Sequence, residues 1–289
     1  MKIDTKSTNQ DIEIPAIGLG TWGIGGFMET DTSQDEEAIQ SIKDAIEIGY
    51  THIDTAELYG AGHTDELIGE AIKGMDRSKL IITNKVFKTN LKYDDVITAC
   101  KTSLEKLQTD YIDIYLIHAP NPDVPLEETM KAMDYLVEKK LVKYIGVSNF
   151  SVAQMEEAQK YSTNKIIANQ IPYNLATRNV NLTRNINRVG GCTNMESEII
   201  PYCQKNNIIV MAYRPIERGF LLEPNELLDS LVQKYGKTKA QIALNWLISK
   251  PNVVVIPKST NPEHLKENLG AIGWQMDDAD IELLDDMKL

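Results

Sequence analysis

The chain reads His52-Ile53-Asp54-Thr55-Ala56-Glu57-Leu58-Tyr59 directly after a segment with helical spacing that ends at Gly49. A short extended run behind a helix is typical of a strand that enters a loop. Asp54 would then stand at the carboxyl end of the strand, and Tyr59 would return from the loop over the same end. An acid and a phenol are therefore expected beside each other at the edge of a sheet.

Two later strand-like runs also end on a polar side chain. Residues 81–85 close on Lys85, and residues 115–118 close on His118. The carboxyl ends of parallel strands lie at one edge of a sheet, where active sites gather. We therefore predict that both side chains meet Asp54 and Tyr59 at one site.

Short β-branched runs alternate with helix-spaced segments along the whole chain. The runs cover residues 16–19, 52–54, 80–85, 111–118, 144–147, 166–170, 208–212 and 253–256. This alternation indicates a parallel sheet with helical crossovers, which fits either an open doubly wound sheet or a closed (β/α)₈ TIM barrel. Polar residues end strands all along the chain, and a length of 289 residues suits the α/β barrel, so we predict the barrel.

We expect residues 1–289 to form a single (β/α)₈ barrel domain with two additions. Residues 12–15 would be half of an N-terminal β-hairpin that closes the barrel floor, and residues 277–289 would form a short C-terminal helix.

Four helix starts carry a local signal. In a capping box, Ser or Thr is followed three positions later by Glu or Gln, and this pattern predicts starts at Ser33, Ser151 and Thr238. Asn261 directly before a proline predicts the fourth.

The composition restricts the class of partner. Lys and Arg number 30 against 42 Asp and Glu, a net charge of −12, so binding to nucleic acid or to an anionic membrane is not expected. The start of the chain has no apolar leader segment, and no apolar run is long enough to span a bilayer. Three cysteines are too few for a disulfide framework or a zinc knuckle. We expect a soluble cytoplasmic protein.

One nucleotide-binding pattern is rejected. Residues 18–23 match G-x-G-x-x-G, which indicates a dinucleotide-binding turn only where a helix opens on it. Here the pattern continues into more glycine, and the next helix is expected only near Ser33. Thr21 and Trp22 would instead lie at the end of the first strand, at the barrel mouth.

The four clustered side chains suggest proton transfer. A tyrosine hydroxyl has an ordinary pKa near 10, and a neighbouring ammonium such as Lys85 lowers it by favouring the phenolate. Asp54 would keep Lys85 charged and in place, and His118 could donate a hydrogen bond that orients a carbonyl oxygen. The set suits protonation of a developing oxyanion by Tyr59. It contains no good nucleophile and no obvious metal cage.

Two other classes of function compete with this one. A metal-dependent barrel hydrolase would use His52, Asp54 and His118, although four histidines leave few ligands and Lys85 would repel a cation. A catalytically weak, cofactor-binding regulatory protein would bind a nucleotide without turnover.

The sequence resembles the aldo-keto reductases from residue 18 to residue 268. The matching motifs, in family order, are Gly18-Leu19-Gly20-Thr21-Trp22, Ile53-Asp54-Thr55-Ala56-x-x-Tyr59-Gly60, Lys85, His118, Gly146-Val147-Ser148-Asn149-Phe150 and Ile256-Pro257-Lys258-Ser259. The resemblance implies an oxidoreductase that reduces aldehydes or ketones with NADPH, or catalyses the reverse oxidation with NADP⁺, on a (β/α)₈ barrel.

Roles carried over by position extend this expectation. The resemblance implies that Tyr59 is the general acid, supported by Lys85, Asp54 and His118, and that Trp22, Tyr59 and His118 contact the substrate. It also implies a carboxamide site at Ser148, Asn149 and Gln170, an aromatic stack from Tyr213, and a 2′-phosphate site at residues 258–260. The full cofactor-binding set expected is Gly20, Thr21, Trp22, Ser148, Asn149, Gln170, Tyr213, Arg214, Pro215, Ile216, Arg218, Gly219, Ile256, Pro257, Lys258, Ser259, Thr260, His264, Glu267 and Asn268.

The sequence departs from the family pattern in two places. His264 stands where the family has an arginine for the 2′-phosphate, and an ordinary histidine is mostly neutral at pH 7 and forms no bidentate fork, so NADH remains an alternative cofactor. Arg214 and Arg218 follow the stacking tyrosine, where they would hold the pyrophosphate or flank the mouth.

The expected partner is a small carbonyl or alcohol substrate, bound by a monomer or weak oligomer. Residues 175–193 contain Arg178, Arg184 and Arg188 and no acidic residue. They form either a solvated surface loop or an anion-binding lid near the mouth.

Overall fold

The computed structural model describes residues 4–178 and 194–288. Eight parallel strands pair in chain order, from β3 to β10. The strands are β3 Leu19–Gly20, β4 His52–Asp54, β5 Ile81–Val86, β6 Ile112–Ile117, β7 Val142–Ser148, β8 Ile166–Pro172, β9 Ile209–Tyr213 and β10 Val253–Val255. Each predicted run overlaps one of them, so the predicted β/α alternation is confirmed.

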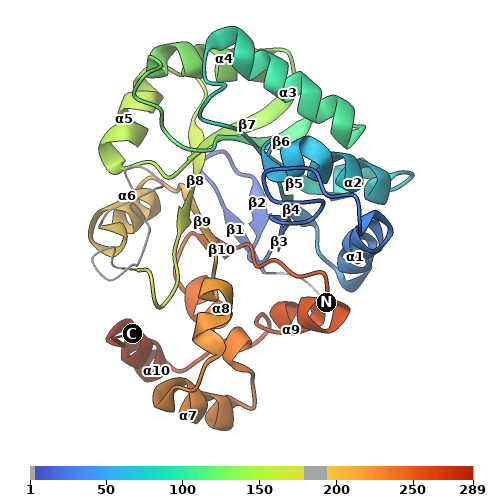
Figure 1. The fold of residues 1–289 in the computed structure, drawn as a ribbon. Helices are drawn as coiled ribbons and strands as arrows, with labels where there is room; N and C mark the ends of the chain where they lie inside the picture. The colour runs from blue at the N-terminus through green and yellow to red at the C-terminus, as the bar shows by residue number, and fades with distance from the viewer. Residues whose placement is uncertain (1–3, 179–193, 289) are drawn as a thin grey trace.

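The last strand returns to the first, which closes the barrel predicted from the sequence. Parallel bridges join Ile17 to Val255 and Gly20 to Lys258. Gly18 N donates to Val255 O over 2.8 Å. The strands form a ring at the centre of the molecule (Figure 1), whereas an open sheet would leave both edges unpaired.

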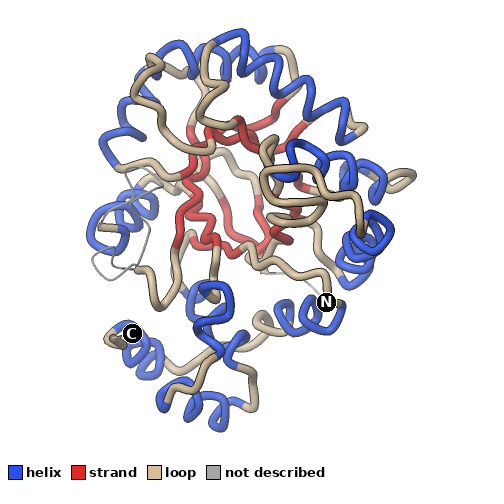
Figure 2. Tube along the Cα trace, viewed as in Figure 1, coloured by secondary structure: helices blue, strands red, loops and turns tan. Residues whose placement is uncertain are grey.

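Helices surround this ring (Figure 2). They are α1 Asp35–Ile48, α2 His63–Ile72, α3 Tyr93–Leu107, α4 Leu126–Glu138, α5 Val152–Lys160, α6 Ile200–Lys205, α7 Glu226–Tyr235, α8 Lys239–Ser249, α9 Pro262–Leu269 and α10 Asp278–Asp285.

Three of the four predicted helix starts are confirmed. The capping boxes at Ser151 and Thr238 are both formed, and the Asn261 side chain accepts a hydrogen bond from Glu263 N at the start of α9. The prediction at Ser33 is wrong. Ser33 N donates to an Asp31 carboxylate oxygen over 3.0 Å, and the helix begins two residues later without a side-chain cap.

An antiparallel hairpin of β1 Thr5–Ser7 and β2 Glu13–Pro15 closes the barrel floor, as predicted. Its Ile14 is fully buried and packs with apolar side chains from the barrel interior. These are Ile114, Leu116, Ile167, Ala168, Ile209, Met211 and Val254. The interior below the mouth is therefore a packed core, and the room for chemistry lies at the carboxyl ends of the strands.

The C-terminal helix α10 is also confirmed, and Leu284 on it is buried. Arg178 lies against this end of the chain. Its guanidinium donates to Leu284 O over 2.8 Å and to Met287 O. This arginine therefore anchors α10 and is not part of an anion-binding lid. Arg184 and Arg188 lie outside the described residues.

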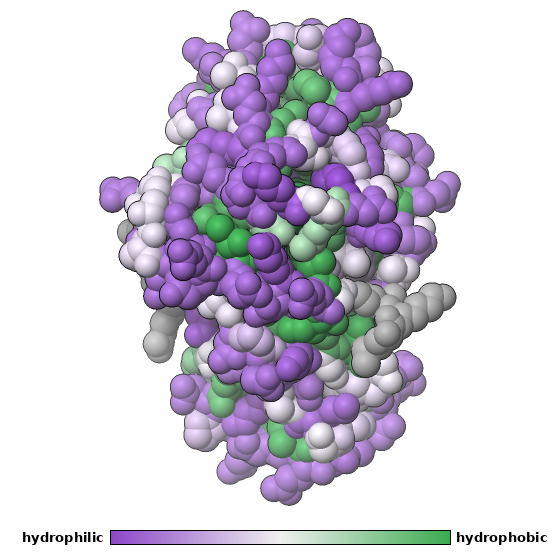
Figure 3. Space-filling view, turned by 90° about the vertical axis from the view of Figure 1, so that its right-hand side faces the viewer, coloured by the Kyte–Doolittle hydropathy of each residue, from purple (hydrophilic) through white to green (hydrophobic). Residues whose placement is uncertain are grey.

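The surface seen in Figure 3 is mostly hydrophilic. Hydrophilic side chains predominate on the side of the molecule shown in Figure 3, and they are broken by small hydrophobic areas. None of the helices within residues 4–178 and 194–288 is long and apolar enough to cross a membrane.

Candidate active site

The predicted catalytic residues lie where parallel strands end. Asp54 is the last residue of β4, Lys85 is next to the last of β5, and His118 directly follows β6. Tyr59 begins the turn Tyr59–Gly62 that follows β4. The barrel closure brings these segments to one mouth.

Lys85 joins Asp54 and Tyr59 in one buried cluster. Its Nζ atom lies 2.8 Å from Asp54 Oδ2, 3.2 Å from the Tyr59 hydroxyl oxygen and 2.6 Å from the backbone oxygen of Thr55. Lys85 is fully buried, and Asp54 and Tyr59 are only 2% and 8% exposed. An ammonium has three protons, so all of them are used inside this cluster.

His118 completes the group that was predicted to meet. Its ring centroid lies 6.0 Å from that of Tyr59. Burial, with a smaller contribution from Lys85, lowers the pKa of His118 to about 3, so the ring is neutral at pH 7. Its Nδ1 atom is buried and has no hydrogen-bond partner among the described residues. A proton on Nδ1 would be unsatisfied, so we assign it to Nε2, where it is available to a ligand.

The pKa of Tyr59 is shifted in the direction opposite to the expectation. Burial raises the pKa of Tyr59, and this effect outweighs the Lys85 ammonium, which lowers that pKa as predicted. Burial alone would lower the pKa of Lys85, but Asp54 and Tyr59 together raise it. At neutral pH Lys85 is therefore charged and Tyr59 holds its proton, as a general acid must.

Asp54 is fully engaged on both of its oxygens. Its Oδ1 atom accepts a hydrogen bond from Gln170 Nε2 over 2.7 Å, while Oδ2 faces Lys85. His52 is buried and its Nε2 lies 2.9 Å from Thr83 Oγ1. A cation held by Asp54 would also face the Lys85 ammonium at 2.8 Å, which disfavours the metal-dependent alternative. No cluster of three or more His, Cys, Asp or Glu within the described ranges could hold a metal ion.

The predicted carboxamide residues form a continuous hydrogen-bond network beside this cluster. Ser148 Oγ donates to Gln170 O over 2.9 Å, and Asn149 Nδ2 donates to His118 O over 3.0 Å. The Tyr213 hydroxyl donates to Asn149 Oδ1 over 3.0 Å. Asn149 has φ +63°, a left-handed conformation that asparagine tolerates better than most residues.

The residues predicted to bind phosphate lie after β9 and β10. Gly20 pairs with Lys258, and a Cβ atom at Gly20 would lie 2.7 Å from Ile256 O, so this close approach requires glycine. Arg214 is half-buried, whereas Arg218 and Lys258 are exposed. In the part of the chain that the structure describes, none of these three cations forms an ion pair.

The remaining predicted cofactor residues occupy the same two segments and α9. Pro215, Ile256, Pro257, Ser259 and Asn268 are buried; Ile216, Gly219 and Glu267 are half-buried; Thr260 and His264 are exposed.

The first strand end borders the mouth, as predicted. Thr21 is buried and its hydroxyl donates to Asp54 O over 2.8 Å. The Trp22 ring is 36% exposed and lies 4.8 Å from the Tyr59 ring, centroid to centroid. The Trp22 and His118 rings therefore both lie beside the Tyr59 ring, and their substrate contacts stay a prediction.

Two residues that the sequence did not single out support this site. The Glu57 carboxylate accepts hydrogen bonds from Phe87 N and from Asn90 Nδ2, which ties the loop after β5 to the loop that carries Tyr59. The Phe87 ring lies 5.8 Å from the His118 ring. Phe87 is two positions beyond Lys85, so strand periodicity could have placed it on the same face. No local pattern marks Glu57.

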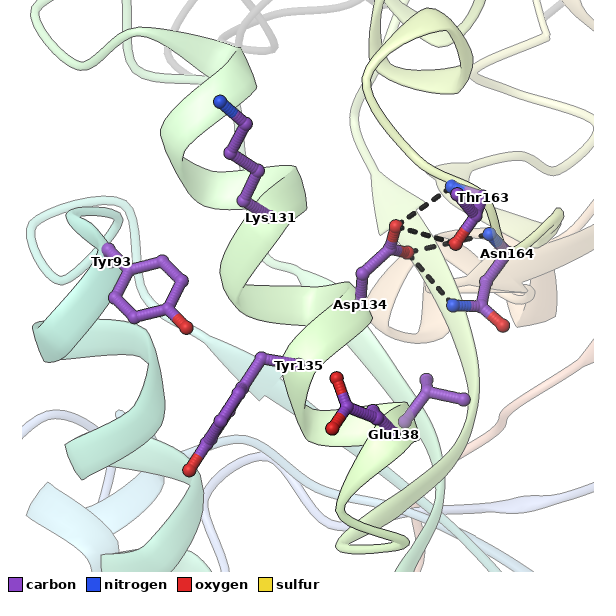
Figure 4. Close-up of a pocket in the computed structure, with 8 residues that line it drawn as sticks. Tyr93, Lys131, Asp134, Tyr135, Glu138, Thr163 and Asn164 are labelled. Atoms are coloured by element: carbon purple, nitrogen blue, oxygen red, sulfur yellow. Dashed lines mark hydrogen bonds between the residues drawn. The ribbon is translucent and has the colours of Figure 1, made fainter.

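A separate pocket lies on the outside of the barrel (Figure 4). Its lining residues come from α3, α4 and the turn before β8, and none belongs to the predicted site. Asp134 in this pocket accepts hydrogen bonds from Ser162, Thr163 and Asn164. Its carboxylate is therefore occupied in holding that turn.

Comparisons with known proteins agree with this geometry. A sequence model described as the aldo/keto reductase family matches residues 16–288. Methylglyoxal reductase YeaE of Escherichia coli K12 is 32% identical over 280 residues, which cover 95% of this chain and 91% of the relative. Glyoxal reductase of Bacillus subtilis is 33% identical over 284 residues, which cover 98% and 92%.

Solved structures share the whole fold. The thermostable aldo-keto reductase Tm1743, crystallised with the inhibitor epalrestat, superposes with a TM-score of 0.91 at 44% identity and covers 98% of this chain and 99% of its own. An aldo/keto reductase from Klebsiella pneumoniae in complex with NADP and acetate has a TM-score of 0.85 at 32% identity, with coverage of 99% and 95%.

Proposed function

The chain belongs to the aldo/keto reductase family, and from this premise we propose that it reduces small aldehydes and ketones to alcohols with NADPH. The observation that carries the proposal is the buried contact of Lys85 with both Asp54 and Tyr59, beside a neutral His118. This arrangement holds a proton next to the place where a carbonyl oxygen would gain charge.

NADPH, when bound, supplies the hydride for the carbonyl carbon. Tyr59 donates its hydroxyl proton to the carbonyl oxygen as negative charge develops there, and Lys85 stabilises the phenolate that remains. Asp54 keeps Lys85 charged and in position. His118 donates a hydrogen bond from Nε2 to the same oxygen and so orients the carbonyl group.

The donor set fits this cofactor. Gln170 uses its amide nitrogen on Asp54, so its amide oxygen is the atom that would face a carboxamide, together with Ser148 and Asn149. Arg214, Arg218 and Lys258 offer positive charge at the other end of the site, which suits phosphate groups. Related aldo-keto reductases have been crystallised with NADP or NADPH.

We propose 2-oxoaldehydes as the first substrates to examine. Two relatives that each cover nine-tenths of this chain or more are reductases of methylglyoxal and of glyoxal. The test is consumption of NADPH and of NADH by the purified protein with methylglyoxal, glyoxal, keto acids and sugars. Turnover of at least one carbonyl with NADPH supports the proposal, and binding of NADPH without any turnover contradicts it.

The cytoplasm is the compartment that we propose. Cys100 and Cys203 are buried free thiols, which is the form that a reducing compartment maintains.

A further inference from the structure

Asp65 on α2 is a completely buried carboxylic acid outside the catalytic cluster. In the ranges that the structure describes, it forms no ion pair. Burial raises the pKa of Asp65, and the hydrogen bonds that its carboxylate accepts only partly offset this effect. Burying a carboxyl group without a cation costs stability, so this acid is a candidate for a role in the reaction.

The two carboxylate oxygens of Asp65 bind the two segments that carry the catalytic cluster. Oδ1 accepts a hydrogen bond from the Thr55 hydroxyl over 2.8 Å, directly after β4. Oδ2 accepts one from Asn84 Nδ2 over 2.8 Å, inside β5. Thr55 follows Asp54 in the chain, and Asn84 precedes Lys85. Asp65 therefore ties together the neighbours of both members of the buried ion pair.

Both partners of Asp65 also contact Lys85. The Thr55 backbone oxygen lies 2.6 Å from Lys85 Nζ. The Asn84 side-chain oxygen accepts a hydrogen bond from Lys85 N over 2.6 Å. Only one buried residue therefore stands between the Asp65 carboxylate and the Lys85 ammonium. A shift of Thr55 would move this ammonium relative to the Tyr59 hydroxyl oxygen, which lies 3.2 Å from it.

We propose that Asp65 is a positioning residue for the carbonyl reduction, and that it fixes the Lys85 ammonium at its distance from the Tyr59 hydroxyl. The inference rests on the proposed reductase function. Asp65 acts through Thr55 and Asn84, because its carboxylate is buried behind them. Proton transfer is sensitive to small changes in the geometry of the reacting groups, so the effect belongs in kcat and not in cofactor binding.

The test compares Asp65→Ala with Glu66→Ala in the purified enzyme. Glu66 is the next residue on α2, and its carboxylate pairs with His63 and Lys106. We expect Asp65→Ala to lower kcat for the best carbonyl substrate at least about tenfold, with the dissociation constant of NADPH unchanged. Glu66→Ala should change kcat by less than about twofold. A lower unfolding temperature in Asp65→Ala with kcat per bound NADPH intact overturns the proposal, since it shows a structural role alone.

Thr55 offers a second pair of variants that keeps the test open where Asp65→Ala does not fold. Thr55→Val removes the hydroxyl that binds Asp65 and keeps the shape of the side chain, whereas Thr55→Ser keeps the hydroxyl. We expect Thr55→Val to lower kcat about tenfold, which is the worth of one hydrogen bond to a carboxylate, and Thr55→Ser to lose less. Equal kcat values in the two variants overturn the proposal.

A wild-type protein that turns over no carbonyl contradicts the reductase function instead, and the position of Lys85 is then measured directly. A buried ammonium gives its own proton–nitrogen cross-peak in NMR spectra because its protons exchange slowly with water, and Lys85→Met identifies this peak by its loss. We expect Thr55→Val to shift the peak and Glu66→Ala to leave it in place. An unchanged peak in Thr55→Val overturns the positioning role of Asp65.

Discussion

Lys85 Nζ lies 2.8 Å from Asp54 Oδ2, and both side chains are almost completely buried. Removing one partner from such a pair leaves an uncompensated charge in the interior, which costs about 3–5 kcal/mol. We therefore expect Lys85→Met to lower the free energy of unfolding by that amount in urea titrations.

The same substitution at the surface provides the control. Lys131 pairs with Glu127 at 2.6 Å, but both side chains are more than half exposed, at 62% and 52%. Lys131→Met should lower stability by less than about 1 kcal/mol. Equal losses in the two variants would show that the Lys85–Asp54 pair does not contribute as the geometry implies.

Stability should fall in mild acid because His118 and His52 stay neutral in the folded protein. The pKa of His118 is lowered to about 3 from an ordinary value of 6.5. Between these pH values the unfolded chain binds a proton at His118 and the folded chain does not, so the stability present above pH 6.5 is lost as the pH falls. The loss approaches about 1.4 kcal/mol per pH unit for one such group. His52, with its pKa lowered to about 4 chiefly by burial, adds to the loss.

Unfolding curves of His118→Gln test whether His118 causes the loss of stability in acid. They are measured between about pH 4 and pH 6, roughly the window set by the ordinary histidine pKa. The slope of the unfolding free energy against pH gives the number of protons taken up on unfolding. This number should be lower in His118→Gln than in the wild type by up to about one. His264→Gln is the control, since His264 is exposed on α9. An unchanged slope in His118→Gln would exclude His118 as a source of the acid sensitivity.

Gly60 should be sensitive to a single added methyl group. It has φ +56°, and a Cβ atom there would lie 2.4 Å from Gly25 O. Gly74 has φ +78° with open space around it, so Gly74→Ala measures backbone strain alone, about 1–2 kcal/mol. We expect Gly60→Ala to be less stable than Gly74→Ala and to lower kcat/KM at least about tenfold, because displacement of Tyr59 disturbs proton transfer. Similar stability and activity in the two variants would contradict this reading of the turn.

Cofactor preference should respond to His264. A guanidinium at this exposed position would add a bidentate partner for a 2′-phosphate beside Lys258. We expect His264→Arg to raise the ratio of kcat/KM for NADPH over NADH about tenfold, with little change for NADH. An increase that is equal for both cofactors would place residue 264 away from the 2′-phosphate.

The barrel was predictable because its signals are local and repeated. Each strand is a short apolar run, and the polar residues at its end, such as Asp54 and Lys85, follow from a period of two along the strand. Ring closure brings those separate ends to one mouth, where Tyr59 contacts Lys85 and the His118 ring lies beside the Tyr59 ring.

Other features depend on contacts that no local pattern encodes. Arg178 binds backbone oxygens of residues 284 and 287, more than one hundred positions away, so its charge alone could not decide between a surface loop and an anion-binding lid. The predicted helix start at Ser33 is wrong because the Ser33 backbone amide donates a hydrogen bond to the Asp31 carboxylate. The pKa of Tyr59 is raised by burial, and that burial depends on packing such as the contact with the Trp22 ring, which the residue type alone does not encode.

The most direct test of the account is kcat for NADPH-dependent carbonyl reduction by Tyr59→Phe, measured together with NADPH affinity. Loss of a positioned general acid should lower kcat by about 10²–10⁴-fold. The dissociation constant for NADPH, from protein fluorescence, should stay close to that of the wild type because Tyr59 is not one of the proposed cofactor residues. A Tyr59→Phe enzyme with wild-type kcat would contradict the account.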